Sequence, residues 1–445
     1  MIRHENSWAA AIPPRWRWHR VRDVFTLLNG FPFPSQHFNS DGEGFPVVRI
    51  RDLLSEDLPT FYNGESGLDV IVHDGDIVIG MDGDFNSVWW KKGEALLNQR
   101  VCALRPVKRS PINARFAFYQ LSTPLKIIND LTPQSTVKHL SSSDVLALRL
   151  PAPDTETQKA IAAFLDEETA HVDQLVEKKR RQAEVLAERE EATFLGIVTG
   201  GSREGRKKSS GVEWIGDMPE HWQAPKFTHI ARQETGHTPS RKKDAYWVPE
   251  ECVIPWFSLA DVWQLRQGGR VFVSETAEKI SHIGMQNSAA RLLPAETVIL
   301  SRTASVGFPA ILAIPMATTQ DFVGWICGER VRPKFLYYVL RAMKPVFRQL
   351  MMGSTHQTIY MPDIRSFRTP LPPLAEQDEI IDWLDRTTGG FRSAAAKITQ
   401  SAERLTEYRS VLITAAVTGQ IDLTTRGKRG NSDRHLDAIE RKMVS

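Results

Sequence analysis

Two Asp-Gly-Asp triplets, Asp74–Asp76 and Asp82–Asp84, lie close together in the first third of the chain. Carboxylates grouped in this way are able to bind a divalent cation, the metal that assists many hydrolytic reactions. A nuclease site of that kind would also need a carboxylate-x-Lys triplet after the intervening strand, and Glu94–Leu96 does not supply one. Asp-Gly pairs are typical of turns, so we favour two turns on either side of a short strand over a metal site.

The other residue types that perform chemistry form no recognisable constellation. The sequence has no GxxxxGK[ST] phosphate loop, no GxGxxG turn after a strand and no HExxH helix. Cys102, Cys252 and Cys327 stand alone, which argues against a disulfide framework and for a reducing compartment. We find neither a secretion signal nor an apolar run of 18 residues, so we expect a soluble, cytosolic chain with no catalytic or metal site of its own.

Basic and amide side chains at the ends of expected strands are the candidate functional residues of this sequence. Arg and Lys suit guanine edges and phosphates, whereas Asn and Gln suit adenine edges, so together they favour contact with DNA. Any one of them alone is more simply an ordinary surface group. The candidates are Arg49, Arg51, Lys91, Lys92, Gln99, Arg100, Lys138, His139, Arg241, Lys242, Lys243, Arg302, Thr303, Gln320, Ser354, Thr355, His356 and Gln357.

Charge is distributed unevenly along the chain, although its net value is only +3. Residues 201–370 carry 22 Lys and Arg against 15 Asp and Glu, whereas residues 151–200 carry 6 against 11. The positive excess therefore lies in one region and the acidic excess in another. A polyanionic ligand would contact the first of these regions.

A block of 66 residues occurs twice, as Ser135–Gly200 and Ser354–Gly419, with 19 identical positions at a constant offset of 219. Upstream, Trp16 and Trp222 match at an offset of 206, as do Pro13 and Pro219. We expect these paired residues to anchor the core of each copy rather than to bind a ligand. The chain thus contains two copies of a whole module, with similar ends and unlike middles. Such an arrangement predicts one scaffold that presents two different surfaces.

Each copy of the block contains a long segment without proline whose apolar residues recur at helical spacing. The pattern predicts a helix of roughly 40 residues, or about 60 Å, and the glycines at 200 and 419 are suitable C-terminal stops. We expect the two helices to pack on each other, although each helix covering its own sheet domain is an open alternative. The packing positions that we expect are Ile161, Leu165, Val172, Leu175, Leu186, Ile380, Leu384, Phe391, Ile398, Leu405 and Leu412.

The unlike parts of the chain read as mixed α+β, because short β-rich runs alternate with Gly, Asp, Asn and Pro, and helical patches are few. Weak similarities between the two parts remain, such as Pro46–Asp52 with Pro255–Asp261 and Asn98-Gln99 with Thr319-Gln320. The expected organisation is a domain at 1–150, a helix at 151–200, a linker at 201–211, a domain at 212–370, a helix at 371–420 and a tail at 421–445.

Several segments together resemble the specificity subunits of type I restriction-modification enzymes. The similarity extends over about residues 8–423, and each motif is modest alone but specific in this order and duplication. The segments are Ser210–Trp222, Gly75–Asp84, Leu97–Val101, Gly353–Gln357, Leu371–Gln377 and Glu407–Gly419.

The resemblance implies an α+β protein with two target-recognition domains in a pseudo-two-fold repeat, separated by two long helices packed as an antiparallel coiled coil. Each domain would read one half of a bipartite, asymmetric DNA sequence. The resemblance also implies that the subunit is not catalytic and needs no cofactor. Two methyltransferase subunits and motor-nuclease (restriction) subunits would be its partners in a bacterial or archaeal cytoplasm. Those partners would use S-adenosylmethionine, ATP and Mg.

The two copies depart from each other at the start of the repeated block. The first reads Pro133–His139 and Ala152–Gln158 where the second keeps the family-like Gly353–Ile359 and Leu371–Gln377. The two partner contacts are therefore not expected to be equivalent. A stand-alone nuclease or a fused restriction-methylation enzyme is a weaker hypothesis, since its motifs are absent, and a helical scaffold that does not bind DNA is a third.

Overall fold

The computed structural model describes residues 12–65, 70–132, 138–266, 270–352 and 358–421. The chain divides into two compact units, which are described separately below. Unit 1 comprises Met1–Lys179 and Gln400–Ser445, and unit 2 comprises Arg180–Thr399. Each of the two long helices, α4 (Thr155–Val198) and α10 (Leu374–Val417), contributes one part to each unit.

Unit 1 is a mixed structure of two main sheets, a two-stranded pair of Arg17–Arg20 with Arg149–Ala152, and a few helices. One sheet has the strand order β2-β10-β7-β8, and the other has the order β3-β5-β4-β9-β6, in which β4 and β9 are parallel. Its elements are β1 (Arg17–Arg20), α1 (Val21–Val24), β2 (Phe25–Asn29), β3 (Phe38–Asn39), β4 (Phe45–Val48), β5 (Phe61–Tyr62), β6 (Ile71–Val72), β7 (Ile77–Gly80), β8 (Ser87–Trp89), β9 (Ala95–Leu97), β10 (Val101–Pro106), α2 (Ala114–Leu131), α3 (Ser142–Ala147) and β11 (Arg149–Ala152).

The sequence explains the main elements of unit 1. All four residues of β7, Ile-Val-Ile-Gly, are buried, as expected for a strand covered on both faces. Helix α2 begins where the Asn113 side chain accepts a hydrogen bond from the Phe116 N–H. The helix continues past Pro124 to Leu131, and Leu125 and Asn129 in its second half are buried.

Unit 2 repeats this architecture. Its larger sheet has the order β14-β21-β18-β19-β16, and a second sheet has the order β17-β15-β20, in which β15 and β20 are parallel. Its elements are β12 (Lys207–Ser209), β13 (Asp217–Pro219), β14 (Ala231–Thr235), β15 (Cys252–Phe257), α5 (Trp263–Arg266), β16 (Phe272–Val273), β17 (Glu278–Ser281), α6 (His282–Gln286), β18 (Val298–Ser301), β19 (Pro309–Leu312), β20 (Ala317–Thr318), β21 (Phe322–Cys327), α7 (Pro333–Ala342), α8 (Lys344–Met351) and α9 (Met361–Ser366).

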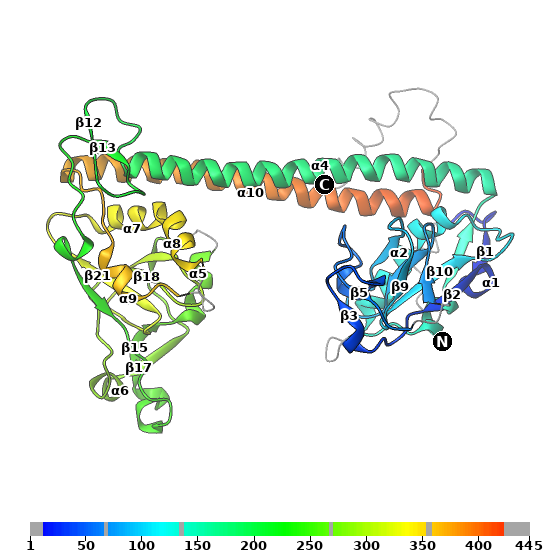
Figure 1. The fold of residues 1–445 in the computed structure, drawn as a ribbon, viewed down its shortest axis with the longest axis horizontal. Coiled ribbons are helices and arrows are strands. Elements are labelled where there is room, and N and C mark those ends of the chain that lie inside the picture. Colours follow the sequence, from blue (N-terminus) through cyan, green and yellow to red (C-terminus); the bar gives the residue numbers. More distant parts are fainter. Residues whose placement is uncertain (1–11, 66–69, 133–137, 267–269, 353–357, 422–445) are drawn as a thin grey trace. The chain divides into compact units, whose positions relative to one another are not determined.

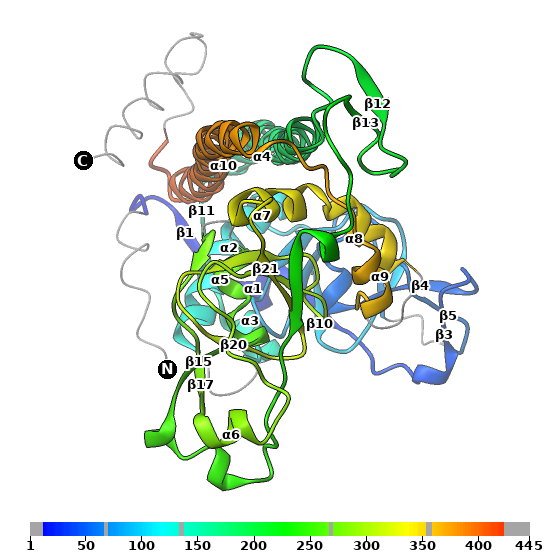
Figure 2. The same ribbon diagram turned by 90° about the vertical axis from the view of Figure 1, so that its left-hand side faces the viewer.

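The two units are built from equivalent strands, so the expected α+β fold, present twice, is confirmed. Strand β14 occupies the place of β2, and β21 and β18 pair as β10 and β7 do. The parallel pair of Val48 with Leu97 corresponds to the pair of Phe257 with Thr318. Within unit 2, α7 lies next to the long helices, whereas β15, β17 and α6 lie at the opposite end (Figures 1 and 2).

The long helices α4 and α10 each contain 44 residues and pack together in antiparallel directions, as expected. In unit 1 the beginning of α4 shares a core with the end of α10, through Ile161, Leu165 and Leu412. In unit 2 the end of α4 shares a core with the beginning of α10, through Phe194 and Ile380.

Both cores also contain residues of the sheet domains, so the helix ends cover the domains as well as each other. The predicted packing positions Val172 and Leu384 are buried too. Those nearer the middle of the helices are half-buried, and their packing stays a prediction: Leu175, Leu186, Phe391, Ile398 and Leu405.

The two expected helix stops are confirmed and have a second role. Helix α4 ends at Val198 and α10 at Val417, and Gly200 and Gly419 follow with φ values of 72° and 73°. A Cβ on Gly200 would lie 2.5 Å from Pro219 Cδ, and one on Gly419 would lie 2.9 Å from Pro13 Cγ. Each helix end is therefore held against the N-terminal segment of a domain.

We expect Gly200→Ala to destabilise unit 2 more than Gly216→Ala. Both glycines have a positive φ, 72° and 65°, but no atom lies within 4 Å of a Cβ built on Gly216. The backbone conformation alone costs about 1–2 kcal/mol for alanine, and the clash with Pro219 and Trp222 adds about 1–3 kcal/mol at Gly200 only. Urea unfolding of both variants measures the difference in their free energies of unfolding. Equal losses would mean that the contact of Gly200 with Pro219 does not contribute to stability.

Two further segments complete the description. The stretch 201–211, expected as a linker, contains strand β12, which pairs with β13 as a hairpin. The expected tail lies outside the described residues from 422 onward. Among the helices of the described residues, none is long and apolar enough to cross a membrane.

Candidate nucleic-acid interface

Some of the identical residues of the repeated block, among them Asp166 and Asp385, lie where each long helix meets its domain. In unit 1 the Asp166 carboxylate accepts a hydrogen bond from Tyr119 Oη at 2.7 Å and pairs with Arg115 at 2.5 Å. In unit 2 the Asp385 carboxylate accepts from Tyr338 Oη and pairs with Lys334 at 2.6 Å. Charge-assisted hydrogen bonds of this kind fix the direction of the helix relative to the domain that it follows.

Two buried glutamines reinforce this joint. Gln377 Oε1 accepts from the Arg332 N–H at 2.8 Å, and its amide donates to the Arg330 and Pro372 carbonyls, each at 2.9 Å. Gln158 makes the same three kinds of bond in unit 1, with the Asn113 N–H and with the carbonyls of Pro111 and Pro153. Both side chains are at most 1% exposed. Because water does not reach this site, the two amides supply hydrogen bonds that these buried backbone groups need.

Glu376 holds the N-terminal segment of the second copy at the same joint. Its carboxylate accepts from His221 Nε2 at 2.7 Å and from Trp222 Nε1 at 3.0 Å, and it pairs with Arg203 at 2.8 Å. Burial by itself raises the pKa of Glu376, but these hydrogen bonds and the Arg203 charge outweigh it, so the pKa lies below the ordinary value of 4.5. The folded state therefore favours the ionised carboxylate.

The lowered pKa of Glu376 predicts an acid dependence of stability. A carboxyl whose pKa is lower in the folded state contributes stability above its unfolded pKa and loses it as the pH falls through the folded value. We expect Glu376→Gln to cost about 1–3 kcal/mol near neutral pH and less below pH 4.5. Urea unfolding between pH 7 and 3 measures this, and a constant difference across that range would contradict the role of the charge.

Four of the predicted DNA contacts of unit 1 lie in two pairs, each around one aspartate. Arg49 and Arg51 follow β4 and lie 2.6 and 4.0 Å from the buried Asp52. Arg100 and His139 meet at Asp82, at 3.4 and 2.7 Å.

The remaining lysines and Gln99 lie elsewhere in unit 1. Lys138 donates to Asn129, and Lys92 donates to the Ser55 carbonyl beside the Trp90 ring. Lys91 is exposed and lines a cleft of about 500 Å³ together with Trp89 and Arg115, and the Gln99 side chain is exposed at the end of β9.

In unit 2 some of the predicted contact residues bond within the fold, and others are exposed. The Arg302 guanidinium donates to the carbonyls of Gln320 and Ile359 at 3.0 and 3.1 Å, so it ties two segments together. Thr303 is bridged to Thr358, and the Gln320 side chain accepts from Thr238 at 2.8 Å. The four positions Ser354, Thr355, His356 and Gln357 lie outside the described residues.

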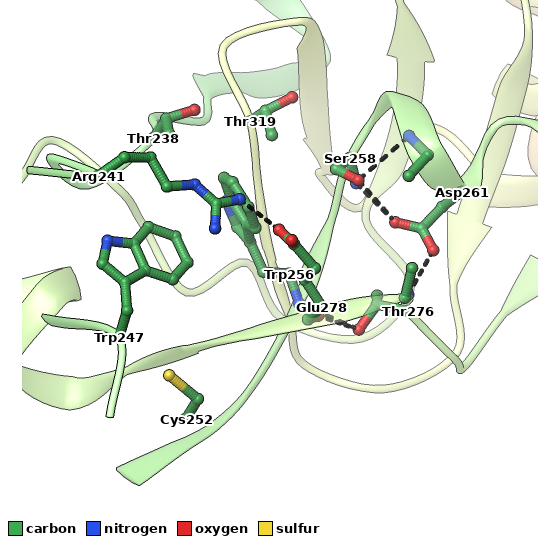
Figure 3. Close-up of polar contacts among 12 residues, drawn as sticks. Thr238, Arg241, Trp247, Cys252, Trp256, Ser258, Asp261, Thr276, Glu278 and Thr319 are labelled. Carbon is green, nitrogen blue, oxygen red and sulfur yellow. Dashed lines mark hydrogen bonds and ion pairs between the residues drawn. The ribbon is translucent and has the colours of Figure 1, made fainter. Parts of the chain in front are cut away.

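Three of the exposed contact residues of unit 2 lie in the loop after β14. The Arg241 guanidinium stacks 3.8 Å from the Trp247 ring centroid and 5.3 Å from that of Trp256, and it pairs with Glu278 (Figure 3). Lys242 is exposed, and Lys243 Nζ donates to Tyr246 Oη at 3.1 Å. Sequence reasoning missed the two tryptophans and Glu278, which are 6 to 37 residues from Arg241 and carry no local signal.

Three aspartates of the two triplets have partners within the protein. Asp74 accepts from the Gly93 N–H, Asp76 pairs with Arg105, and Asp82 pairs with Arg100 and His139. Over the residues that the structure describes, no three His, Cys, Asp or Glu side chains are grouped so as to hold a metal ion. Asp74-Gly75 and Gly83-Asp84 lie in turns on either side of β7, as the sequence predicts.

The cysteines also lack the properties of nucleophiles. Burial raises the pKa of Cys102 to about 12, and burial, with a smaller contribution from Glu296, raises the pKa of Cys327 to about 12. Burial, together with the neighbouring Glu251, also raises the pKa of Cys252. A thiol becomes reactive when its pKa is lowered, so all three are held in the unreactive form at neutral pH.

The profile of the family described as "Type I restriction modification DNA specificity domain" matches residues 13–185 and 219–404. The chain belongs to this family. The match is double, as the duplication of the fold requires.

Individual relatives agree with this assignment. The EcoBI specificity subunit of Escherichia coli is 27% identical over 432 residues, which cover 94% of this chain and 88% of that one. The MjaVIII specificity subunit of Methanocaldococcus jannaschii is 21% identical over 383 residues, covering 84% and 86%.

A solved chain from a structural study of complex assembly and conformational transition in a type I R-M system has the same fold. Its TM-score is 0.69 at 15% sequence identity, and the match covers 92% of this chain and 99% of that one.

Proposed function

We propose that this chain is the DNA-recognition subunit of a type I restriction-modification complex. Each unit contains one recognition domain, and each domain reads one half of a bipartite, asymmetric target. The observation that carries the proposal is the repeat of one fold with the same helix joint, Tyr119 with Asp166 and Tyr338 with Asp385, but with unlike polar side chains elsewhere. One frame with two different surfaces is what a target with two different halves requires.

The recognition step combines two kinds of contact. Exposed cations such as Lys91 and Lys242 would contact phosphates, a term that fixes the position on DNA and weakens with salt. Side chains that protein groups already hold, such as Arg241, are better suited to base edges, because a fixed donor pattern distinguishes one base from another. Arg302 bonds internally to two carbonyls, and we therefore assign it a structural role.

The chain itself would perform no chemistry in this complex. Asp74, Asp76 and Asp82 are bound by protein groups and the three thiols have raised pKa values, which supports a role without catalysis. Two methyltransferase subunits would supply S-adenosylmethionine-dependent adenine methylation. Motor-nuclease subunits would supply translocation and cleavage that depend on ATP and Mg. The long helices, which the two units share, are the part of the chain that we propose as their docking frame.

Mapping methylated adenines across the genome of a host that carries this chain and its methyltransferase partner tests the proposal. The expected result is one bipartite motif with two different halves and an unread spacer. The purified chain alone should bind the same sequence in a salt-dependent manner and methylate nothing. A single undivided motif, or methylation by the chain alone, would contradict the proposal, and binding that does not depend on DNA sequence would favour a scaffold.

A further inference from the structure

The loops after β2 and β14 occupy equivalent places in the two units. The first is Gly30–His37 and the second is Gly236–Lys243, at the same offset of 206 that relates Trp16 to Trp222. The Phe31 N–H donates to the Leu97 carbonyl at 2.9 Å, and the His237 N–H donates to the Thr318 carbonyl at 3.0 Å. Both loops therefore leave the fold at the end of the parallel strand pair.

Close packing at the start of each loop fixes its direction. A Cβ on Gly30 would lie 2.0 Å from the Asn98 carbonyl oxygen, and one on Gly236 would lie 2.0 Å from that of Thr318. Only glycine allows the chain to pass so close to another backbone. Within each unit these loops lie on the side away from the long helices, next to β3 and β5 in unit 1 and to β15 and β17 in unit 2 (Figures 1 and 2).

The loop of unit 2 is held along its whole length. Trp256 Nε1 donates to the His237 carbonyl at 3.3 Å, and Trp247 Nε1 donates to the Ser240 carbonyl at 3.1 Å. Thr238 Oγ1 donates to Gln320 Oε1 at 2.8 Å. A loop that is already ordered loses little conformational entropy when it binds.

Contacts with neighbouring side chains hold Arg241 in place and leave part of its guanidinium exposed. The two indole rings hold the face of its guanidinium, and Glu278 accepts from one Nη (Figure 3). Among the described residues, Glu278 is its one hydrogen-bond partner, and the Arg241 side chain is 52% exposed. A guanidinium has five N–H donors in a rigid plane, so an oriented donor edge remains available to a ligand.

The loop of unit 1 also has an aromatic cluster, and one of its exposed polar residues is Gln36. Phe33 is 7% exposed and lies 4.7 Å from the Tyr62 ring, and the His37 ring lies 5.8 Å from Tyr62. Gln36 is exposed, and its Nε2 lies 3.2 Å from His37 Nε2. The exposed polar side chains thus include an amide in the loop of unit 1 and a guanidinium in the loop of unit 2.

We propose that these two loops are base-reading elements of the two domains, and that Arg241 reads a guanine and Gln36 an adenine. Arg241 would donate two hydrogen bonds to guanine O6 and N7 in the major groove, while the Gln36 amide matches the donor and acceptor of adenine N6 and N7. Glu278 is a positioning residue that holds the guanidinium plane. The inference rests on the proposed function, because it names the bases which the two domains distinguish.

Four variants of the full chain, expressed with the methyltransferase partner, test the inference by mapping methylated adenines. Arg241→Gln is expected to lower discrimination at one guanine of one half-site by about 10- to 100-fold. Arg241→Lys should relax the same position, since lysine keeps the charge but not the planar pair of donors. Gln36→Ala should relax one adenine in the other half-site only. Arg291→Gln, at an exposed arginine of unit 2 outside the loop, should leave both halves unchanged.

The remaining outcomes separate the inference from the proposed function. If Arg241→Lys keeps the wild-type motif, Arg241 contacts a phosphate and the inference is wrong. If Arg241→Gln and Gln36→Ala both keep the motif, the loops do not read bases. Glu278→Gln, which leaves Arg241 in place, should give a weaker relaxation at the same guanine, and relaxation elsewhere would count against it. If the wild-type chain gives no bipartite motif, the proposed function itself fails.

Discussion

Exchange of residues 12–150 for the corresponding domain of a subunit with another target is expected to change one half of the methylated sequence and leave the other half intact. Each mismatched base pair costs about 1–3 kcal/mol, roughly additively, so three new positions amount to a change of about a hundredfold or more in preference. The effect should stay in one half because the polar joint of unit 1 uses only its own domain and helix parts, such as Tyr119 with Asp166.

The donor domain must supply the partners of this joint. It needs a tyrosine at the position of Tyr119 and a cation at that of Arg115, because Asp166 and Gln158 stay behind in the recipient. The matched control is the exchange of residues 212–370, which should change the other half alone. Mapping methylated adenines is the measurement, and a change in both halves after one exchange would mean that the two domains do not read independently.

The second large effect is expected from Gln377→Met, which removes the amide without removing its volume. Three backbone groups would lose their partner in a site that is 0% exposed: the Arg332 N–H and the carbonyls of Arg330 and Pro372. A buried unsatisfied group costs about 1–3 kcal/mol, so for three groups we expect a loss of about 3 kcal/mol or more. That is a large part of the stability of a typical domain.

Two matched variants show which unit of the chain loses stability. Gln400→Met makes the same change at an exposed position of α10 and should cost little. Gln158→Met breaks the equivalent three bonds in unit 1 and should destabilise that unit instead. Amide hydrogen exchange distinguishes the two units, and protection factors in unit 2 that survive Gln377→Met would rule out a role of this residue in stability.

Polar contacts between residues far apart in the sequence could not be predicted from the sequence. The periodic apolar residues predicted the long helices correctly, because helical spacing is a local property. Arg302 is a candidate DNA contact by type and position, but the structure uses its donors on two carbonyls 18 and 57 residues away. Side-chain type does not reveal whether a partner inside the fold has already taken the hydrogen bonds.

The two reading loops illustrate the same limit from the other side. Arg241 was found from its type, yet the rings of Trp247 and Trp256 that orient it come from different elements. Gln36 was missed because a single glutamine among prolines and phenylalanines carries no signal. Only the equivalence of the two loops, each bonded to the end of a parallel strand pair, relates the loop that contains Gln36 to the loop that contains Arg241.

The sequence by itself determined the duplication, the two long helices with their glycine stops, the α+β character of the unlike parts and the family. These properties depend on local periodicity, on turn chemistry and on comparison of one part of the chain with another. Only the tertiary structure decided why Gln158, Asp166 and their counterparts are identical in the two copies, and which polar groups are held internally. Hydrogen bonds between residues far apart in sequence exist only once the fold has brought them together, so no local pattern records them.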